Sequence, residues 1–524
     1  MTNLLYRKPW RQFPWTLGAL LLLSTASWAD KPPSLADLPE PARTWAQWSL
    51  EAIERDWDAE AGMLGGRGNH SSRLNAQYAL ALLLRDTPGD AERACSVMEK
   101  VLACQFNTPE TPYHGTYKRS PKSDVPPESP IVWKDYDPNW REFIGTIQIL
   151  MLHAYEPVLP SAFVAQLDQA LRLAAEGAHA RAVAAEYTNI SVMSAYLLGY
   201  AGQRFGVAEW RRHSETLARE IFENFQVHET FDEYNSPTYY GVNFYGLALW
   251  RRYPLSEDME RMGRALEVGL WRDVARFYHA GMKNLCGPFD RSYGMDMRRY
   301  VTLLGAWIAF HVPVDAAPLP KPAQGAPKSF EFGTLPAYAM LYGDIPDDVR
   351  PGLLAFTGER TLARPIGHIG SRVATAWIGE EVMAGGGATR ELRKAWKQDH
   401  PATVHWKIPG GEVGWIRFVA GLPARATASK GQLDIACPLD VPAKRPRTAS
   451  FLIACPDISS DRFTASQWDL PGLKVTVDTN AGKARVEKTR GHLSVTYEVP
   501  QDGALRTLSF SLKLNPTGAA HVSE

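Results

Sequence analysis

Residues 137–151, DPNWREFIGTIQILM, carry the pattern that decides the fold. Asp137 followed by Pro138 predicts the start of a helix, because a carboxylate caps free backbone N–H groups and proline fits the first helical position. Apolar residues then recur three and four positions apart, which places them on one helical face. They are Phe143, Ile144, Ile147, Leu150 and Met151. The stretch therefore predicts an amphipathic helix packed against a core.

The same spacing recurs from residue 41 to residue 311. It is found in runs at 45–53, 74–84, 163–175, 190–200, 242–250, 259–278 and 301–310. With weaker runs between them, these predict about ten helices joined by turns that contain Gly, Pro and Asn. No repeat of fixed period favours a solenoid. Consecutive helical hairpins favour an α/α toroid, an incomplete barrel, and an irregular bundle is the alternative.

The pattern changes after residues 312–327, VPVDAAPLPKPAQGAP, which we interpret as a linker. Beyond it apolar and polar residues alternate, as in the segment 508–514, and this period predicts half-buried strands. Further strands are expected at 373–378, 415–419 and 493–499. Segments 473–477 and 484–486 flank a turn at 480–482 and predict a hairpin. We therefore expect an antiparallel β-sandwich.

The amino end predicts export. Arg7, Lys8 and Arg11 precede a short apolar run that ends in Ser27-Trp28-Ala29, the arrangement of a secretory signal cut after Ala29. The run is short for a membrane span, and an uncleaved anchor is the alternative. The predicted organisation is a signal peptide at 1–29, a toroid at 30–311, a linker at 312–327 and a sandwich at 328–524. We expect a periplasmic or secreted monomer that no longer contacts the membrane.

Composition narrows the classes of partner. Lys and Arg together number 57, as do Asp and Glu. The formal net charge is therefore zero, and it gives no overall electrostatic attraction to nucleic acid. Five cysteines match no zinc motif, and export permits disulfides, for which 95/104 and 437/455 are the nearest pairs. No metal-ligand cluster or phosphate-binding glycine loop is evident, so we expect neither metal nor cofactor.

Five polar turns stand at predicted helix starts. The densest is 231–241, FDEYNSPTYYG, and the next is 284–296, NLCGPFDRSYGMD. The others lie at 187–191, 68–73 and 136–142. Each alone has a plainer interpretation as a helix cap or an ordered loop. In a toroid, however, alternate helix ends meet at one mouth, so these turns are expected to line one cleft.

Together, the helical region, the sandwich and these turns resemble the α/α-toroid polysaccharide lyases, which include chondroitin, heparin and alginate lyases. The sequence particularly resembles the lyases that act on glucuronan or alginate. The resemblance implies β-elimination on a uronate-containing polysaccharide. In that reaction an Asn, often with a His or Glu, neutralises the uronate carboxylate. A Tyr or His removes the C5 proton, and a Tyr protonates the leaving O4.

Carried onto this chain, the resemblance implies Tyr293 as the base with Tyr239 as the alternative, and Asn189 and Glu233 as further catalytic residues. Arg291 is expected to bind a carboxylate and to favour the ionised form of Tyr293. The remaining substrate-binding candidates come from the same turns and are Asn235, Tyr240, His70, Asn139, Trp140 and Arg141. The segment 231–241 lacks the His of the chondroitin-lyase pattern, which His70, His114 or His228 would have to supply.

Two other functions fit the same residues. A glycoside hydrolase on a helical toroid would use two carboxylates, such as Asp232 or Glu233 with Asp290 or Asp296. A glycan-binding protein of an uptake system would need no catalytic set. The sandwich is expected to support the cleft, and its candidates for reaching across are His368, Arg372, His400 and His405.

Overall fold

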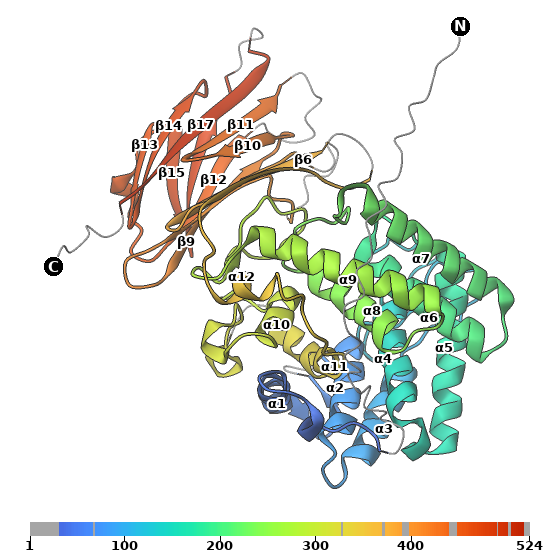
Figure 1. Cartoon of the computed structure of the whole chain (residues 1–524). Helices are drawn as coiled ribbons and strands as arrows, with labels where there is room; N and C mark the ends of the chain where they lie inside the picture. Colours follow the sequence, from blue (N-terminus) through green and yellow to red (C-terminus); the bar gives the residue numbers. More distant parts are fainter. Residues whose placement is uncertain are drawn as a thin grey trace, which may run out of the picture.

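The computed structural model describes residues 31–65, 69–325, 329–368, 372–389, 398–439, 448–489, 491–500 and 505–517. A helical region is followed by a strand-rich region, and the two lie against each other (Figure 1). The expected signal peptide falls outside the described residues. Within them, no helix has the length and apolar character that crossing a bilayer requires.

An inner ring of helices forms the centre of the helical region. Helices α2, α4, α6, α8 and α10 contact one another in that order, and α11 contacts α2. Trp307 of α10 stacks on Tyr338 of α11 at 5.4 Å between ring centroids, which links the last two members. The bounds are α2 Ser72–Arg85, α4 Trp140–Tyr155, α6 Thr188–Arg204, α8 Tyr240–Arg252, α10 Leu303–Ala309 and α11 Leu335–Met340.

Outer helices cover this ring. Each of α3, α5, α7 and α9 packs against the inner helix that precedes it, and α1 packs against α11. The inner helices are buried on nearly all sides, whereas the outer ones bury one face only, as expected for two concentric layers. The outer bounds are α1 Ala42–Ile53, α3 Asp90–Leu102, α5 Ser161–Arg181, α7 Ala208–His228 and α9 Glu257–Phe277. The predicted α/α toroid is confirmed.

Two boundaries differ from the sequence-based expectation. Helix α4 begins at Trp140 instead of Pro138, because the Asp137 carboxylate accepts from the backbone N–H of Asn139 (3.0 Å) in the preceding turn. Helical elements also continue past 312–327, since α11 and α12 (Arg350–Leu354) follow, and the first strand of the large sheet begins only at Arg360. Both late helices are short and contain proline, so they lack a long apolar period.

The strand-rich region is an antiparallel sandwich, as predicted. Phe451 of the larger sheet packs on Trp468 and Phe510 of the smaller one, at 5.1 and 5.2 Å between centroids. The larger sheet has the order β15 (Ala484–Thr489), β16 (His492–Glu498), β12 (Thr448–Ala454), β9 (Val413–Ala420), β8 (Ala402–Lys407), β7 (Val382–Gly386), β6 (Val373–Ile378), β5 (Arg360–Pro365). The smaller has the order β10 (Arg425–Ser429), β11 (Gln432–Pro438), β17 (Thr507–Pro516), β14 (Leu473–Thr479), β13 (Gln467–Leu470).

The predicted hairpin of 473–477 with 484–486 is wrong. Strand β14 pairs with β13 and β17 in one sheet, and β15 pairs with β16 in the other. The turn between them carries the chain from sheet to sheet, and the Asn480 side chain accepts from the backbone of Ser509 in β17 (2.8 Å). Long-range pairing outweighs the local turn signal here. The five cysteines are free thiols, so neither suggested pair is bridged.

The helical and strand-rich regions are in direct contact through backbone atoms. Gly385 of β7 faces Gly287 in the loop that follows β4 (Asn284–Leu285), and a Cβ atom at Gly385 would overlap the Gly287 carbonyl group. The backbones of Phe289 and His400 also exchange two hydrogen bonds, of 3.1 and 2.9 Å. The 286–302 loop of the helical region is therefore held directly on the larger sheet.

Candidate functional site

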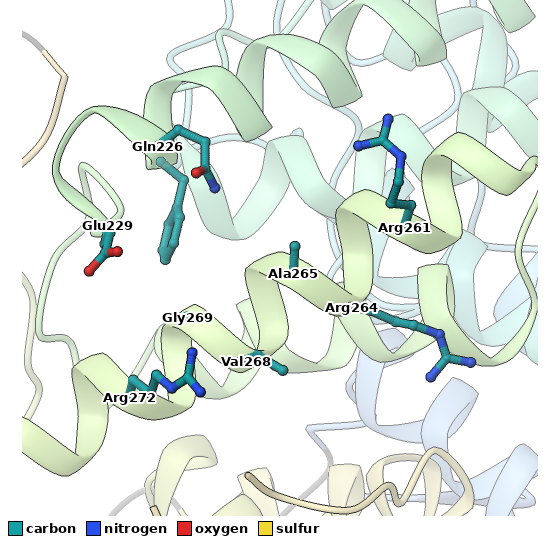
Figure 2. A pocket seen from close by; sticks show the side chains of 9 residues that line it. Gln226, Glu229, Arg261, Arg264, Ala265, Val268, Gly269 and Arg272 are labelled. Atoms are coloured by element: carbon teal, nitrogen blue, oxygen red, sulfur yellow. The ribbon is translucent and has the colours of Figure 1, made fainter. Parts of the chain in front are cut away.

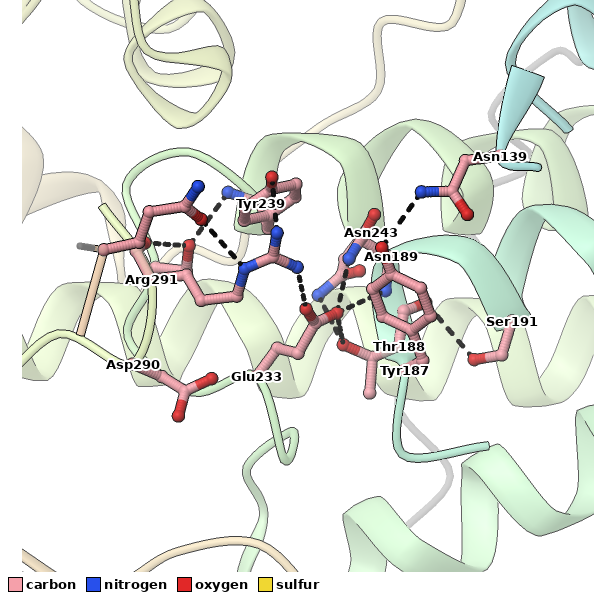
Figure 3. A network of polar contacts seen from close by, with 12 residues as sticks. Asn139, Tyr187, Thr188, Asn189, Ser191, Glu233, Tyr239, Asn243, Asp290 and Arg291 are labelled. Carbon is pink, nitrogen blue, oxygen red and sulfur yellow. Dashed lines mark hydrogen bonds and ion pairs between the residues drawn. The ribbon is translucent and has the colours of Figure 1, made fainter. Parts of the chain in front are cut away.

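The starts of the inner helices lie together at one end of the ring. Asn139, which precedes α4, donates through Nδ2 to the hydroxyl of Tyr187, which precedes α6 (2.9 Å). Asn243 in the first turn of α8 donates to the hydroxyl of Thr188 at the start of α6 (3.4 Å). The predicted polar turns at 136–142, 187–191 and 231–241 thus adjoin one another (Figure 3).

Glu233 is the centre of this arrangement. Its Oε2 atom accepts from the Asn189 side chain (2.5 Å), the Asn189 backbone (3.0 Å) and the Thr188 hydroxyl (3.2 Å). Its Oε1 atom accepts from Nη1 of Arg291 (2.7 Å). The side chain is 1% exposed. The carboxylate therefore lies at the N-terminus of α6, where helix N–H groups and the dipole favour an anion.

Arg291 connects this carboxylate to the tyrosines. Its Nη2 atom donates to the Tyr239 hydroxyl (2.7 Å), and its Nε atom donates to Oε1 of Gln398 (3.2 Å). Burial opposes the charge, but Glu233 outweighs it and raises the pKa of Arg291 above its ordinary value. Since all three nitrogens have partners, binding a substrate carboxylate as expected would require Arg291 to share or leave them.

Tyr239 and Tyr293 form a pair whose hydroxyl oxygens are 2.7 Å apart. Tyr293 is 38% exposed, whereas Tyr239 lies deeper, between Tyr293 and the guanidinium of Arg291. Burial raises the pKa of Tyr239 well above 10, and the charge of Arg291 partly offsets this effect. We expected Arg291 to act on Tyr293 directly. The structure instead places Tyr239 between them. We name Asn189, Glu233, Arg291, Tyr239 and Tyr293 the tyrosine network.

The turns that carry the network are fixed by buried amides and hydroxyls. Asn235 donates through Nδ2 to the carbonyl groups of Cys286 (2.7 Å) and Pro288 (2.9 Å) and is 1% exposed. Ser236 donates to the carbonyl of Arg291 (2.5 Å). Asn235, expected to bind substrate, therefore joins the 231–241 turn to the 286–302 loop.

Several other predicted binding residues lie away from the network. The Tyr240 hydroxyl is buried and donates to Asp273 of α9 (2.8 Å). His70 pairs with Asp58 (2.9 Å). Arg141 is 1% exposed and donates to the backbone of Pro112 and His114. Trp140 is partly buried against the core.

The histidines proposed to replace the missing one also have other contacts. His70 pairs with Asp58, and His114 pairs with Glu176 at 3.0 Å. The carbonyl group of His228 accepts from Arg364 of β5 (2.9 Å). Among the contacts of the described residues, none of these three reaches the tyrosine network.

All four candidates from the strand-rich region reach the turns. His368 pairs with Asp232 (2.8 Å), and Arg372 pairs with Asp290 (3.0 Å). Nε2 of His400 lies 3.1 Å from the carbonyl oxygen of Ser292, and Nε2 of His405 lies 2.7 Å from that of Met295. The sandwich therefore supports the site from one side, through contacts with the turns beside the network.

Sequence reasoning missed two neighbours of Arg291. Tyr187 lies in a turn that was selected for Asn189, and its ring centroid is 5.8 Å from the Arg291 guanidinium carbon. Gln398 lies more than a hundred residues further along the chain and belongs to no motif. Only the fold brings it to Arg291.

A pocket of about 570 Å³ lies elsewhere, between the outer helices α7 and α9 (Figure 2). Its arginines are paired with acids: Arg261 with Asp258, Arg264 with Glu260 and Arg272 with Asp348. None of its lining residues belongs to the tyrosine network. In the part of the chain that the structure describes, no three His, Cys, Asp or Glu residues are grouped to hold a metal.

Solved structures with similar chain arrangements are remote. A heparan sulfate lyase HepC mutant from Pedobacter heparinus is 11% identical at a TM-score of 0.33, with 94% of this chain and 86% of that chain covered. The Streptomyces coelicolor A3 chondroitin AC lyase in complex with chondroitin sulphate is 11% identical at 0.37, covering 91% and 97%. A β-arabinofuranosidase is 8% identical at 0.29, covering 90% and 89%. Values this low decide neither substrate nor reaction.

No curated protein matches the sequence. Two family models do. A domain of unknown function, DUF8769, matches residues 43–343, and a second, DUF8770, matches residues 357–522. The first covers the toroid through α11, and the second covers the sandwich. Because DUF8769 alone spans more than half of the chain, this protein belongs to the DUF8769 family, with a DUF8770 domain following.

Proposed function

We propose that the protein is an exported polysaccharide lyase that cleaves a uronate-containing polysaccharide by β-elimination, with Tyr239 and Tyr293 as its acid/base pair. The observation that carries the proposal is the chain of contacts from Glu233 through Arg291 and Tyr239 to Tyr293, each 2.7 Å long. It joins two phenols to a fixed cation and ends at Tyr293, whose side chain is partly exposed.

The reaction needs a base for the C5 proton, an acid for O4 and a cation that favours the ionised base. Removing the C5 proton beside a carboxylate builds negative charge, and a tyrosine with an ordinary pKa near 10 needs a nearby cation to act as base. Arg291 supplies that cation to whichever phenol of the pair has lost its proton. Tyr293 takes the C5 proton, the C–H electrons form the C4=C5 double bond, and the C4–O4 bond breaks. The pair then returns the proton to O4, which restores its starting state.

Asn189 and Glu233 are positioning residues in this proposal. The Asn189 amide donates to Glu233, and Glu233 fixes the guanidinium beside Tyr239. This differs from the role that the resemblance implied, in which Asn189 contacts the uronate. A preorganised cation next to the developing charge is the kind of feature that contributes most to such reactions.

The hydrolase alternative is less well supported, because its carboxylates are paired. Asp232 bonds to His368, Asp290 to Arg372, and Glu233 to Arg291. Burial acts to raise the pKa of Asp296, but hydrogen bonds from Arg298 and Asn284 outweigh it and lower that pKa. A glycosidase needs one carboxyl with a raised pKa as its acid.

An ultraviolet assay tests the proposal. The protein is incubated with glucuronan, alginate and glycosaminoglycans, and absorbance from a conjugated double bond is followed. New absorbance with one of these polymers is the expected result. Cleavage without new absorbance would indicate hydrolysis, and retention of polymer without cleavage would indicate a binding protein.

A further inference from the structure

The long connection between α3 and α4 lies at the same end of the ring as the tyrosine network. Ser72 at the start of α2 contacts this connection twice, through its backbone N–H to Arg119 O (3.0 Å) and its hydroxyl to Lys118 O (2.7 Å). The connection ends at Asn139, which bonds Tyr187 beside Arg291. It therefore contacts the starts of α2 and α6, and Tyr187 links it to Arg291 of the network.

The tip of this connection presents apolar side chains to solvent. Ile131 is 56% exposed, Val132 39% and Trp133 49%. Single exposed apolar residues are common on protein surfaces, but a contiguous group marks a contact surface. Three consecutive large apolar residues beside polar turns therefore indicate a binding surface.

The tip is also held in an unusual conformation. Trp133 has φ +63°, in the left-handed region that bulky residues rarely adopt. Arg119 donates to the carbonyl groups of Trp133 (2.6 Å) and Lys134 (2.8 Å), and the Trp133 N–H donates to Tyr136 O (2.8 Å). Local strain that surrounding bonds maintain is typical of functional positions. These bonds hold the backbone at Trp133 in this conformation.

We propose that this tip, Ile131–Val132–Trp133, is a second carbohydrate contact, in which the Trp133 indole packs on the apolar C–H face of a sugar ring. This inference rests on the proposed function, because the sugar belongs to the same uronate polymer that reaches Tyr293. Lys134 beside the indole is exposed and provides a positive charge for a uronate carboxylate. A rigid aromatic side chain loses little conformational entropy on binding, which suits such a contact.

The position of the tip makes the contact dependent on polymer length. Trp133 is six residues from Asn139, so the chain places it no more than about 20 Å away. A longer polysaccharide extends further from Tyr293 and has more units that can contact the tip, so the contribution of the tip should grow with substrate length. Loss of the indole should therefore weaken polymer binding most and affect short substrates least.

The experiment compares Trp133→Ala, Trp133→Phe and Arg119→Ala in the full mature chain. Migration in gels that contain glucuronan or alginate measures polymer binding, and KM and kcat are measured on polymer and on a tetrasaccharide. Trp133→Ala should raise the polymer KM and weaken retardation about three- to tenfold, with kcat and tetrasaccharide kinetics unchanged. Trp133→Phe should retain most binding. Arg119→Ala should reproduce the defect with the indole still present.

Val227→Ala is the matched control, because Val227 is an exposed apolar residue (52%) at the end of outer helix α7. It should change nothing. Unchanged polymer binding in Trp133→Ala would contradict the inference and leave the lyase proposal intact. So would equal losses on polymer and tetrasaccharide, or a lowered unfolding temperature that accounts for the defect.

The two proposals can fail separately. If the unmodified protein forms no unsaturated product from any polymer, the lyase proposal fails, and gel retardation still tests the tip. Retardation that is lost in Trp133→Ala alone would then support a carbohydrate contact. Retardation equal in both proteins, or absent from both, would overturn it.

Discussion

Nδ1 of His368 lies 2.8 Å from Oδ2 of Asp232, and Nε2 of the same ring lies 3.5 Å from Oε1 of Glu186. Asp232 precedes Glu233, and Glu186 precedes Tyr187. One histidine of the strand-rich region therefore bonds both turns that hold the arginine and its carboxylate.

Replacing His368 by alanine should lower kcat about tenfold or more and destabilise the fold by about 1–3 kcal/mol, because two carboxylates lose a shared partner. His368→Gln retains a side-chain amide and should recover part of both losses. Turnover and urea unfolding measure the two effects. An alanine variant with wild-type kcat would show that the network does not depend on this contact.

Tyr293→Phe should lower kcat by a factor of about 10² to 10⁴, with polymer binding retained, because the ring remains and only the proton acceptor is lost. Tyr239→Phe should be similarly impaired, since it breaks the link to Arg291. Formation of unsaturated product and gel retardation measure rate and binding separately. If both phenylalanine variants keep full activity, elimination by tyrosine is wrong.

Glu233→Gln tests the positioning role of this carboxylate. It leaves the Arg291 guanidinium partly buried without its anion, which costs about 3–5 kcal/mol when one partner of such a pair is removed. We expect a lower unfolding free energy together with lower activity. Arg291→Lys keeps the charge but cannot reach Glu233, Tyr239 and Gln398 together, so it should also be impaired. A hydrolase could also lose activity in Glu233→Gln, but it would in addition be inactive as Asp290→Asn and active as Tyr293→Phe.

Stability should fall in mild acid because of two buried histidines. Burial lowers the pKa of His400 to about 3 and that of His405 to about 4, from an ordinary 6.5. Below pH 6.5 the unfolded chain binds protons that the folded chain does not. The free energy of unfolding should therefore decrease as pH falls from 6.5 toward 3, by up to about 1.4 kcal/mol per pH unit for each ring.

Urea unfolding between pH 7.5 and 4.5 measures this slope. His400→Gln and His405→Gln should each reduce it, because an amide can donate to Ser292 O or Met295 O without titrating. Buried His153 and His311, whose pKa values burial lowers to about 4 and about 3, contribute to the remaining slope. A slope equal in all three proteins would assign the acid sensitivity to other groups.

The sequence allowed the strongly periodic elements to be predicted. Helix α4 and strand β17 each carry a clear apolar repeat, and their classes are confirmed. Helix α11 was missed, because LPAYAM is too short to show a period and its burial comes from neighbouring helices. The hairpin at 480–482 failed for a related reason, since β14 pairs with a strand more than thirty residues away.

The candidate site also has a part that the sequence predicts and a part that only the fold determines. That the polar turns adjoin follows from the arrangement of helix starts in a ring. Which side chains meet does not follow. Tyr239 and Tyr240 are adjacent, yet consecutive residues at a helix start point about 100° apart. One therefore contacts Arg291 and the other Asp273. No sequence pattern pointed to Gln398, because its contact with Arg291 depends on how the sandwich packs against the toroid.

The close approach of Gly385 to Gly287 has a consequence for how this family changes over time. A side chain at Gly385 would push the larger sheet away from the 286–302 loop, and the histidine contacts beside it would lengthen together. We therefore expect substitutions on the two sides of this join to depend on one another. A hybrid that took each part from a different relative should keep an active network only if residues 287 and 385, and the two histidines at 400 and 405 with their carbonyl partners, came from compatible parents.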